Sequence, residues 1–134
     1  TRRGGDITIT ARDYRKSDNL ASDLGCKSID WPTRQNHECD VLVNCTPVGM
    51  HPNLDESPFE AEWLSKSTLV FDTVYNPEQT LLIKYARDTE CKFITGVDMF
   101  VLQAAQQYKL FTGREPEVKL IRYEVKRATS AARY

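Results

Sequence analysis

The sequence predicts an α/β fold in which a parallel β-sheet is flanked by helices. Short apolar runs such as Val41–Val43 and Leu69–Phe71 are typical of buried strands. Between them lie longer stretches whose apolar residues recur at helical spacing, such as Tyr14–Leu24 and Val97–Phe111. Strands that alternate with helices along a chain imply parallel pairing and right-handed crossovers.

Five strands are expected where β-branched and apolar residues are bounded by turn-forming residues. In chain order they are Asp6–Ala11, Cys26–Ile29, Asp40–Asn44, Thr68–Asp72 and Lys92–Thr95. The first follows the Gly4-Gly5 break, which favours a turn before the strand begins.

Five helical segments are expected around these strands: Tyr14–Leu24, Glu60–Leu64 (one or two turns), Glu78–Asp88, Val97–Phe111 and Pro116–Arg127. Gly25 and Gly113 are expected to end the first and fourth. Helical spacing predicts the buried faces: Leu20, Ala21 and Leu24; Leu81, Leu82 and Tyr85; and Val118, Ile121 and Val125.

Two polar stretches that contain proline, Asp30–Glu38 and Cys45–Pro58, are expected to be loops. No internal repeat or linker interrupts the chain, so we expect one domain over residues 1–127. The remaining residues, Ala128 to Tyr134, are expected to form a flexible tail.

The composition is typical of a globular domain. The 134 residues are 40% hydrophobic and 28% charged, enough for one domain with a core. A formal net charge of -1 gives no reason to expect nucleic acid or an anionic membrane as a partner. No apolar run approaches the ~20 residues of a membrane span, and no signal peptide is recognisable at the N-terminus.

The four cysteines contain no C-x-x-C pair, and the two histidines share no metal-ligand spacing with them. We therefore expect no metal site. Isolated cysteines in a domain of this size indicate buried thiols in a reducing compartment, so a cytoplasmic location is expected.

Three segments place small polar groups, turns or a helix start directly after predicted strands. The Asn44 segment is Asn44-Cys45-Thr46-Pro47-Val48-Gly49-Met50, the Asp72 segment is Asp72-Thr73-Val74-Tyr75-Asn76-Pro77, and the Gly96 segment runs from Gly96 to Ala105. In open α/β sheets ligands bind at the carboxyl ends of the strands. These segments are therefore the candidate functional residues, although Asn, Pro and Gly are also common at any strand exit.

Taken together and in this order, the three segments resemble the nucleotide-binding half of shikimate dehydrogenases. The Asn44 segment closely resembles the family's Asn-Ala-Thr-x-x-Gly-Met pattern, and the match extends from about Asp6 to Phe111. The resemblance implies a Rossmann-like parallel sheet flanked by helices. It also implies an oxidoreductase of the shikimate pathway that uses NADP, reducing 3-dehydroshikimate to shikimate in aromatic amino acid biosynthesis.

The resemblance also implies roles for individual residues. Tyr75 and Gln103 would bind the substrate, shikimate or 3-dehydroshikimate. The implied cofactor-binding residues are Arg12, Asp13, Arg15, Lys16, Asn44, Thr46, Thr73, Gly96 and Met99. The family's catalytic lysine and aspartate lie in a separate N-terminal domain, so no catalytic residue is expected in this chain.

Each of these residues also has an ordinary structural interpretation. Taken alone, Tyr75 is explained by a half-buried aromatic with a solvated hydroxyl, and the surrounding motif favours the substrate role instead. Met99 and Phe100 are also explained by plain core packing. For Gln103 the alternative is a solvated helix residue, although Val101, Leu102, Ala104 and Ala105 favour a buried or cleft position.

The end of the first expected strand bears on the choice of coenzyme. Arg12 suits the 2′-phosphate of NADP, because a guanidinium binds phosphate bidentately. Asp13 departs from the family pattern and favours the ribose hydroxyls of NAD, or else caps the following helix. Arg15 and Lys16 are more simply explained as solvated helix charges.

No G-x-G-x-x-G sequence is present, so the glycine-rich phosphate loop and the central first strand of the fold are expected to be absent from this chain. We expect the domain to be incomplete, to expose two strand edges and to dimerise, rearrange or be part of a longer product. The isolated chain is expected to have no dehydrogenase activity. Whether a dehydroquinate dehydratase precedes it, as in bifunctional relatives, is open.

Two alternatives remain. One is a quinate/shikimate dehydrogenase that prefers NAD, which Asp13 supports. The other is a non-catalytic α/β binding module without a phosphate loop, against which Tyr75 and Gln103 argue.

Overall fold

The structure is a computed structural model that describes residues 4–131. Contacts divide the chain into two compact units, residues 1–38 and 39–134. The sequence predicted a single domain over residues 1–127, and that assignment stays a prediction.

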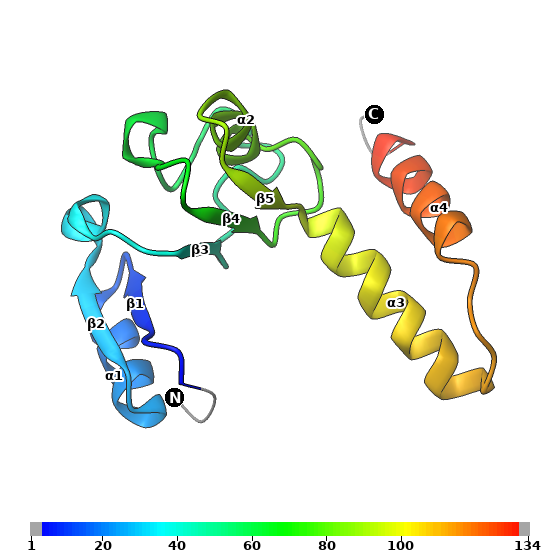
Figure 1. The fold of residues 1–134 in the computed structure, drawn as a ribbon, viewed down its shortest axis with the longest axis horizontal. Coiled ribbons are helices and arrows are strands. Elements are labelled where there is room, and N and C mark those ends of the chain that lie inside the picture. Colours follow the sequence, from blue (N-terminus) through cyan, green and yellow to red (C-terminus); the bar gives the residue numbers. More distant parts are fainter. Residues whose placement is uncertain (1–3, 132–134) are drawn as a thin grey trace. The chain divides into compact units, whose positions relative to one another are not determined.

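The N-terminal unit contains one parallel β-α-β element. Strand β1 (Thr8–Ala11) pairs in parallel with β2 (Lys27–Asp30), and α1 (Tyr14–Leu24) forms the crossover between them (Figure 1). The bounds of α1 are those predicted, and it ends at Gly25. Its buried residues are Ser17 and Ala21, whereas Leu20 and Leu24 are exposed. The prediction that both leucines face the core is therefore wrong for this structure.

A 3-10 helix, η1 (Trp31–Asn36), occupies most of the stretch that was predicted to be a loop. The Arg34 guanidinium lies 3.9 Å from the centroid of the Trp31 ring, and it donates a hydrogen bond of 2.7 Å to the Trp31 carbonyl. Pro32 is compatible with this helix because the first helical turn needs no N–H donor. The loop prediction is therefore wrong for these residues.

The C-terminal unit contains a parallel sheet of three strands in the order β3-β4-β5 (Figure 1). The strands are β3 (Val41–Asn44), β4 (Leu69–Asp72) and β5 (Lys92–Ile94). A long loop and the 3-10 helix η2 (Ala61–Trp63) connect β3 to β4, and α2 (Leu81–Asp88) connects β4 to β5. In this register Asn44 lies opposite Asp72, so β3 and β4 end side by side.

The core of this unit lies between α2, β4 and η2. Val70, Leu82 and Ala86 are buried there with Leu64 and Cys91. Burial of each large apolar side chain contributes about 1.5–3 kcal/mol. Of the three residues of α2 that were predicted to face inward, Leu82 is buried, whereas Leu81 and Tyr85 are only partly buried. The other buried residues of this helix are Ile83 and Ala86.

The cysteines differ from the expectation that all four are buried thiols. Cys91 is buried, Cys26 is partly buried, and Cys39 and Cys45 are exposed. Two of the four cysteines are therefore exposed residues that flank β3, where Cys39 precedes the strand and Cys45 follows it.

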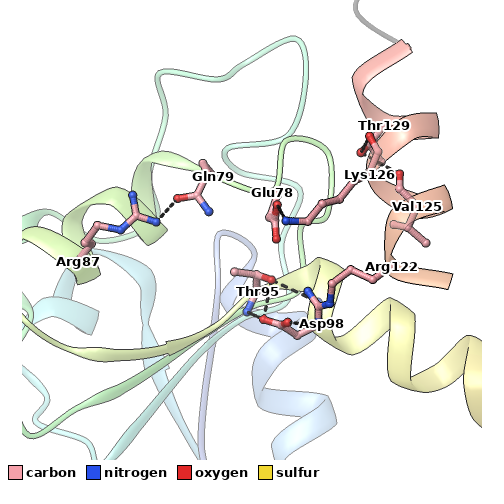
Figure 2. A network of polar contacts seen from close by, with 9 residues as sticks. All are labelled: Glu78, Gln79, Arg87, Thr95, Asp98, Arg122, Val125, Lys126 and Thr129. Atoms are coloured by element: carbon pink, nitrogen blue, oxygen red, sulfur yellow. Dashed lines mark hydrogen bonds and ion pairs between the residues drawn. The ribbon is translucent and has the colours of Figure 1, made fainter. Parts of the chain in front are cut away.

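The last two helices pack against each other. They are α3 (Gly96–Thr112) and α4 (Val118–Ala131). Figure 2 shows how α4 is attached: Arg122 donates to the Asp98 carboxylate at 2.6 Å, and Lys126 pairs with Glu78 at 3.0 Å. Helix α4 continues to Ala131, so the predicted tail is helical from Ala128 to Ala131. Its last residues, 132–134, lie outside the described residues.

The five strands form two sheets, β1-β2 and β3-β4-β5. Over residues 4–131 no strand pairing joins them, so the outer strands β1, β2, β3 and β5 each carry one unpaired edge. That two of these edges are exposed by the lack of a central strand stays a prediction. In the same part of the chain, no helix is long and apolar enough to cross a membrane.

Candidate functional site

The Asn44 and Asp72 segments meet where β3 and β4 end. The backbone N–H of Thr73 donates to the Asn44 carbonyl at 3.0 Å, and the Thr73 hydroxyl donates to the same oxygen at 2.8 Å. Further along, the His51 N–H donates to the Asn76 carbonyl at 3.3 Å. The parallel register therefore brings together two segments that lie 28 residues apart in the sequence.

The buried side chain of Asn44 holds its own segment in a turn. Its amide nitrogen donates to the Val48 carbonyl at 3.3 Å and to the Asp72 carboxylate at 3.0 Å. Its amide oxygen accepts from the Thr46 N–H at 3.0 Å and from the Thr46 hydroxyl at 2.7 Å. All four hydrogen-bonding positions of the amide are thus occupied within the protein. A direct contact of this side chain, or of Thr46, with a cofactor stays a prediction.

Gly49 closes the turn of the Asn44 segment. Its φ is 86°, a left-handed conformation that glycine adopts without a Cβ penalty. A Cβ at this position would lie 3.2 Å from the Glu56 carbonyl oxygen. Backbone conformation and close packing both favour glycine here.

Asp72 is a fully buried carboxylate at the end of β4. One oxygen accepts from the Asn44 amide and from the Val74 N–H, each at 3.0 Å. The other accepts from the Thr80 hydroxyl at 2.6 Å, and Thr80 in turn caps α2 by accepting from the Ile83 N–H at 3.3 Å. Burial raises the pKa of Asp72, and the hydrogen bonds from Thr80, Val74 and Asn44 oppose that shift.

The Gly96 segment starts against the backbone of the Asp72 segment. A Cβ on Gly96 would lie 2.3 Å from the Val74 carbonyl oxygen and 2.6 Å from that of Thr73. A capping box fixes the start of α3: the Thr95 hydroxyl accepts from the Asp98 N–H, and the Asp98 carboxylate accepts from the Thr95 N–H. All three segments therefore converge within the C-terminal unit.

An aromatic pair links the Asp72 and Gly96 segments. The rings of Tyr75 and Phe100 have centroids 5.4 Å apart and are tilted by 37°. Phe100 is 39% exposed and Tyr75 is 44% exposed, so neither is plain core. Met99 is partly buried, whereas Gln103 is exposed. The expectation that Gln103 is buried is therefore wrong for this structure, whereas a cleft position and its substrate role stay predictions.

The predicted cofactor residues of the N-terminal unit form a charged group at the end of β1. Arg12, Asp13, Arg15 and Lys16 are all exposed. Asp13 stands at the N-cap position of α1 but makes no side-chain capping bond, and its carboxylate lies 3.9 Å from the Lys16 ammonium. The capping role considered for the Asp13 side chain is therefore not realised.

No individual role was predicted from the sequence for Asp72, Thr80 or Phe100, although Asp72 and Phe100 lie within the candidate segments. The burial of Asp72 could have been predicted from the sequence, because residues two apart on a strand face the same side of the sheet. Val70 and Asp72 share a face, and both are fully buried. The partnership of Tyr75 with Phe100 depends on how α3 leaves β5, which no local pattern reveals.

Parallel strands with helical crossovers, together with polar turns gathered at the strand ends, define a Rossmann-like α/β domain of the nucleotide-binding type. A family model described as "Shikimate 5'-dehydrogenase C-terminal domain" matches residues 96–126. A shikimate dehydrogenase (NADP(+)) of Maridesulfovibrio salexigens is 38% identical over 118 residues, covering 87% of this chain and 43% of that protein.

Solved structures agree. The shikimate 5-dehydrogenase of Thermus thermophilus, solved with NADP(H) and shikimate, superposes with a TM-score of 0.80 at 26% identity, covering 96% of this chain and 48% of that one. A quinate dehydrogenase of Corynebacterium glutamicum in complex with NAD gives a TM-score of 0.74 at 29% identity, with 95% and 46% covered.

Over most of its length this chain is similar to shikimate dehydrogenases. It matches the C-terminal part of these proteins and spans about half the length of the curated relatives that it matches.

Proposed function

We propose that this chain is the nucleotide-binding half of an NADP-dependent shikimate dehydrogenase. The intact enzyme would interconvert 3-dehydroshikimate with NADPH and shikimate with NADP. The observation that carries this proposal is the convergence of three family-like segments at the strand ends: the Asn44 turn, the Asp72 segment and the start of α3 at Gly96. Strand ends of this kind are where open α/β sheets bind ligands.

The nicotinamide supplies the hydride chemistry, and the protein binds and orients the reactants. In this chain Thr73, Gly96 and Met99 would lie along the nicotinamide, with Asn44 and Thr46 forming the turn beneath the cofactor. Tyr75 would donate its hydroxyl hydrogen to an oxygen of the substrate, because it is exposed and its ring is held by Phe100. Gln103 is proposed to reach the substrate hydroxyls in the intact enzyme.

The charged group of the N-terminal unit supports NADP as the coenzyme. Arg12, Arg15 and Lys16 are exposed cations available to the 2′-phosphate. The loose contact between Asp13 and Lys16 offsets part of the negative charge that would repel that phosphate. The Asp13 carboxylate makes no capping hydrogen bond to α1. It therefore also supports the alternative, an enzyme that prefers NAD and accepts quinate.

Steady-state assays of the complete reading frame that contains this chain test the proposal. Each substrate, shikimate or quinate, is combined with NADP or NAD, and coenzyme reduction is followed by absorbance. The highest kcat/KM with shikimate and NADP would support the proposal, and the highest value with NAD would favour the alternative. Absence of turnover in all four combinations would favour a non-catalytic binding module.

Further proposals follow from the same assignment. The 134-residue chain alone is expected to show no turnover, because none of its described residues supplies the family's catalytic lysine and aspartate.

A reducing, cytoplasmic location is proposed, since the free Cys39 and Cys45 are exposed. Association of copies through the unpaired edges of β1 and β3 is proposed for the isolated chain, with neither nucleic acid nor membrane as a partner.

A further inference from the structure

The fully buried carboxylate of Asp72 lies where the Asn44 and Asp72 segments meet. We propose that Asp72 is a positioning residue that fixes both segments together and thereby sets affinity for cofactor and substrate at once. This inference rests on the proposed function, because it assigns a role within that same site.

The donors to Asp72 come from three different parts of the unit. The Asn44 amide belongs to the turn after β3, the Val74 N–H to the chain leaving β4, and the Thr80 hydroxyl to the start of α2. An acceptor-only carboxylate suits three converging donors, whereas a neutral side chain of similar shape supplies fewer acceptor positions. A buried carboxylate is costly unless it is hydrogen-bonded in this way.

On one side the Asp72 carboxylate holds the turn of the Asn44 segment in place. Its hydrogen bond to the Asn44 amide nitrogen orients that amide, so the amide oxygen faces Thr46 and accepts two hydrogen bonds. The same nitrogen donates to the Val48 carbonyl. Loss of the Asp72 acceptor would free the amide to rotate, and the turn proposed to lie beneath the cofactor would lose its anchor.

On the other side the carboxylate controls the segment that carries Tyr75. It holds the N–H of Val74, the residue directly before Tyr75, and the Val74 carbonyl packs against Gly96 at the start of α3. A shift of Val74 would therefore move Tyr75 relative to its ring partner Phe100. Asp72 touches neither cofactor nor substrate in this account and acts through its neighbours.

A purely structural role is the competing explanation, and Thr80 separates the two. Thr80 is as buried as Asp72 and donates to its second oxygen, but it also caps α2, and its side chain meets the Asn44 segment by packing beside Gly49, which valine would preserve. Thr80→Val should therefore lower stability while the acceptor for Asn44 and Val74 remains. Asp72→Ala removes that acceptor, and Asp72→Asn keeps one oxygen that can accept from Asn44 and Val74.

The experiment measures kcat, both KM values and the urea midpoint for the wild-type complete reading frame and these variants. We expect Asp72→Ala to raise KM for NADP and for shikimate by about tenfold each, as loss of a charged hydrogen-bond acceptor implies. Asp72→Asn should restore most of both KM values. Thr80→Val should lower the urea midpoint and leave both KM values near those of the wild type.

Unchanged KM values in folded Asp72→Ala, or an equal rise in Thr80→Val, would overturn the inference. Should Asp72→Ala not fold, Asp72→Ser measured with both ligands present takes its place. Failure of both to fold would assign Asp72 a structural role instead. A wild-type protein that does not turn over shikimate would refute the proposed function together with this inference, whereas an active wild type with unaffected variants would refute the inference alone.

Discussion

Gly96 lies so close to Val74 that a Cβ on the glycine would stand 2.3 Å from the Val74 carbonyl oxygen. The first residue of α3 therefore packs directly on the backbone that leads from β4 to Tyr75. The family resemblance implied that Gly96 binds the cofactor. The structure adds a reason within the protein, because a larger residue would push α3 away from the Asp72 segment.

Gly96→Ala is predicted to destabilise the protein by about 3 kcal/mol, since the backbone atoms it meets cannot rotate aside as a side chain would. Gly113→Ala at the other end of α3 is the matched control. Its φ of 69° makes alanine unfavourable by about 1–2 kcal/mol, but no atom lies within 4 Å of the added Cβ. Urea unfolding of both variants measures the difference, and equal losses would contradict this account.

Arg12→Ala is predicted to raise KM for NADP by about tenfold and to leave KM for NAD nearly unchanged, because only NADP carries the phosphate that Arg12 would bind. Arg114→Ala removes an exposed arginine near the end of α3 and controls for the general loss of positive charge. Initial rates with each coenzyme provide the measurement. An equal rise in KM for NADP and for NAD would show that Arg12 does not bind the 2′-phosphate.

The Asp98 carboxylate links α3 to α4, and its ionisation should make stability depend on pH (Figure 2). Burial alone would raise the pKa of Asp98, but hydrogen bonds from Thr95 and the contact with Arg122 outweigh it and lower the pKa. A lowered pKa stabilises the folded state above about pH 4, and this contribution is lost as the pH falls through the folded-state pKa.

Asp98→Asn is therefore predicted to lower the urea midpoint at pH 7, and the difference from wild type should shrink below about pH 4. Asp88→Asn, at an exposed position on α2, controls for the loss of a surface charge. Midpoints measured from pH 7 to pH 3 give the profile. A difference for Asp98→Asn that stays constant, or grows, as the pH falls would contradict the assigned role.

Local patterns predicted most elements because their signals lie within a few residues. Gly25 and the apolar spacing gave the bounds of α1, and the apolar run before Asp72 gave β4. The 3-10 helix at Trp31 was missed because Pro32 was read as a loop signal, whereas the stacking of Arg34 on Trp31 depends on side-chain geometry.

The candidate site was predicted as segments but not as a network. The order of the segments indicated that they belong together, yet only the register of β3 with β4 places Asn44 beside Asp72. Burial was the weakest expectation: Leu20, Leu24 and Gln103 have helical spacing typical of a packed face but are exposed. Helical spacing identifies a face and does not reveal whether another element covers it.

Tyr75→Phe tests most directly whether the converging segments form the substrate site. Loss of the hydroxyl is predicted to raise KM for shikimate by about tenfold, while KM for NADP stays near its wild-type value. Tyr108→Phe makes the same change at a tyrosine of similar exposure, 43% against 44% for Tyr75, and should alter neither constant. Measured in the complete reading frame, an unchanged KM for shikimate in Tyr75→Phe would contradict the account.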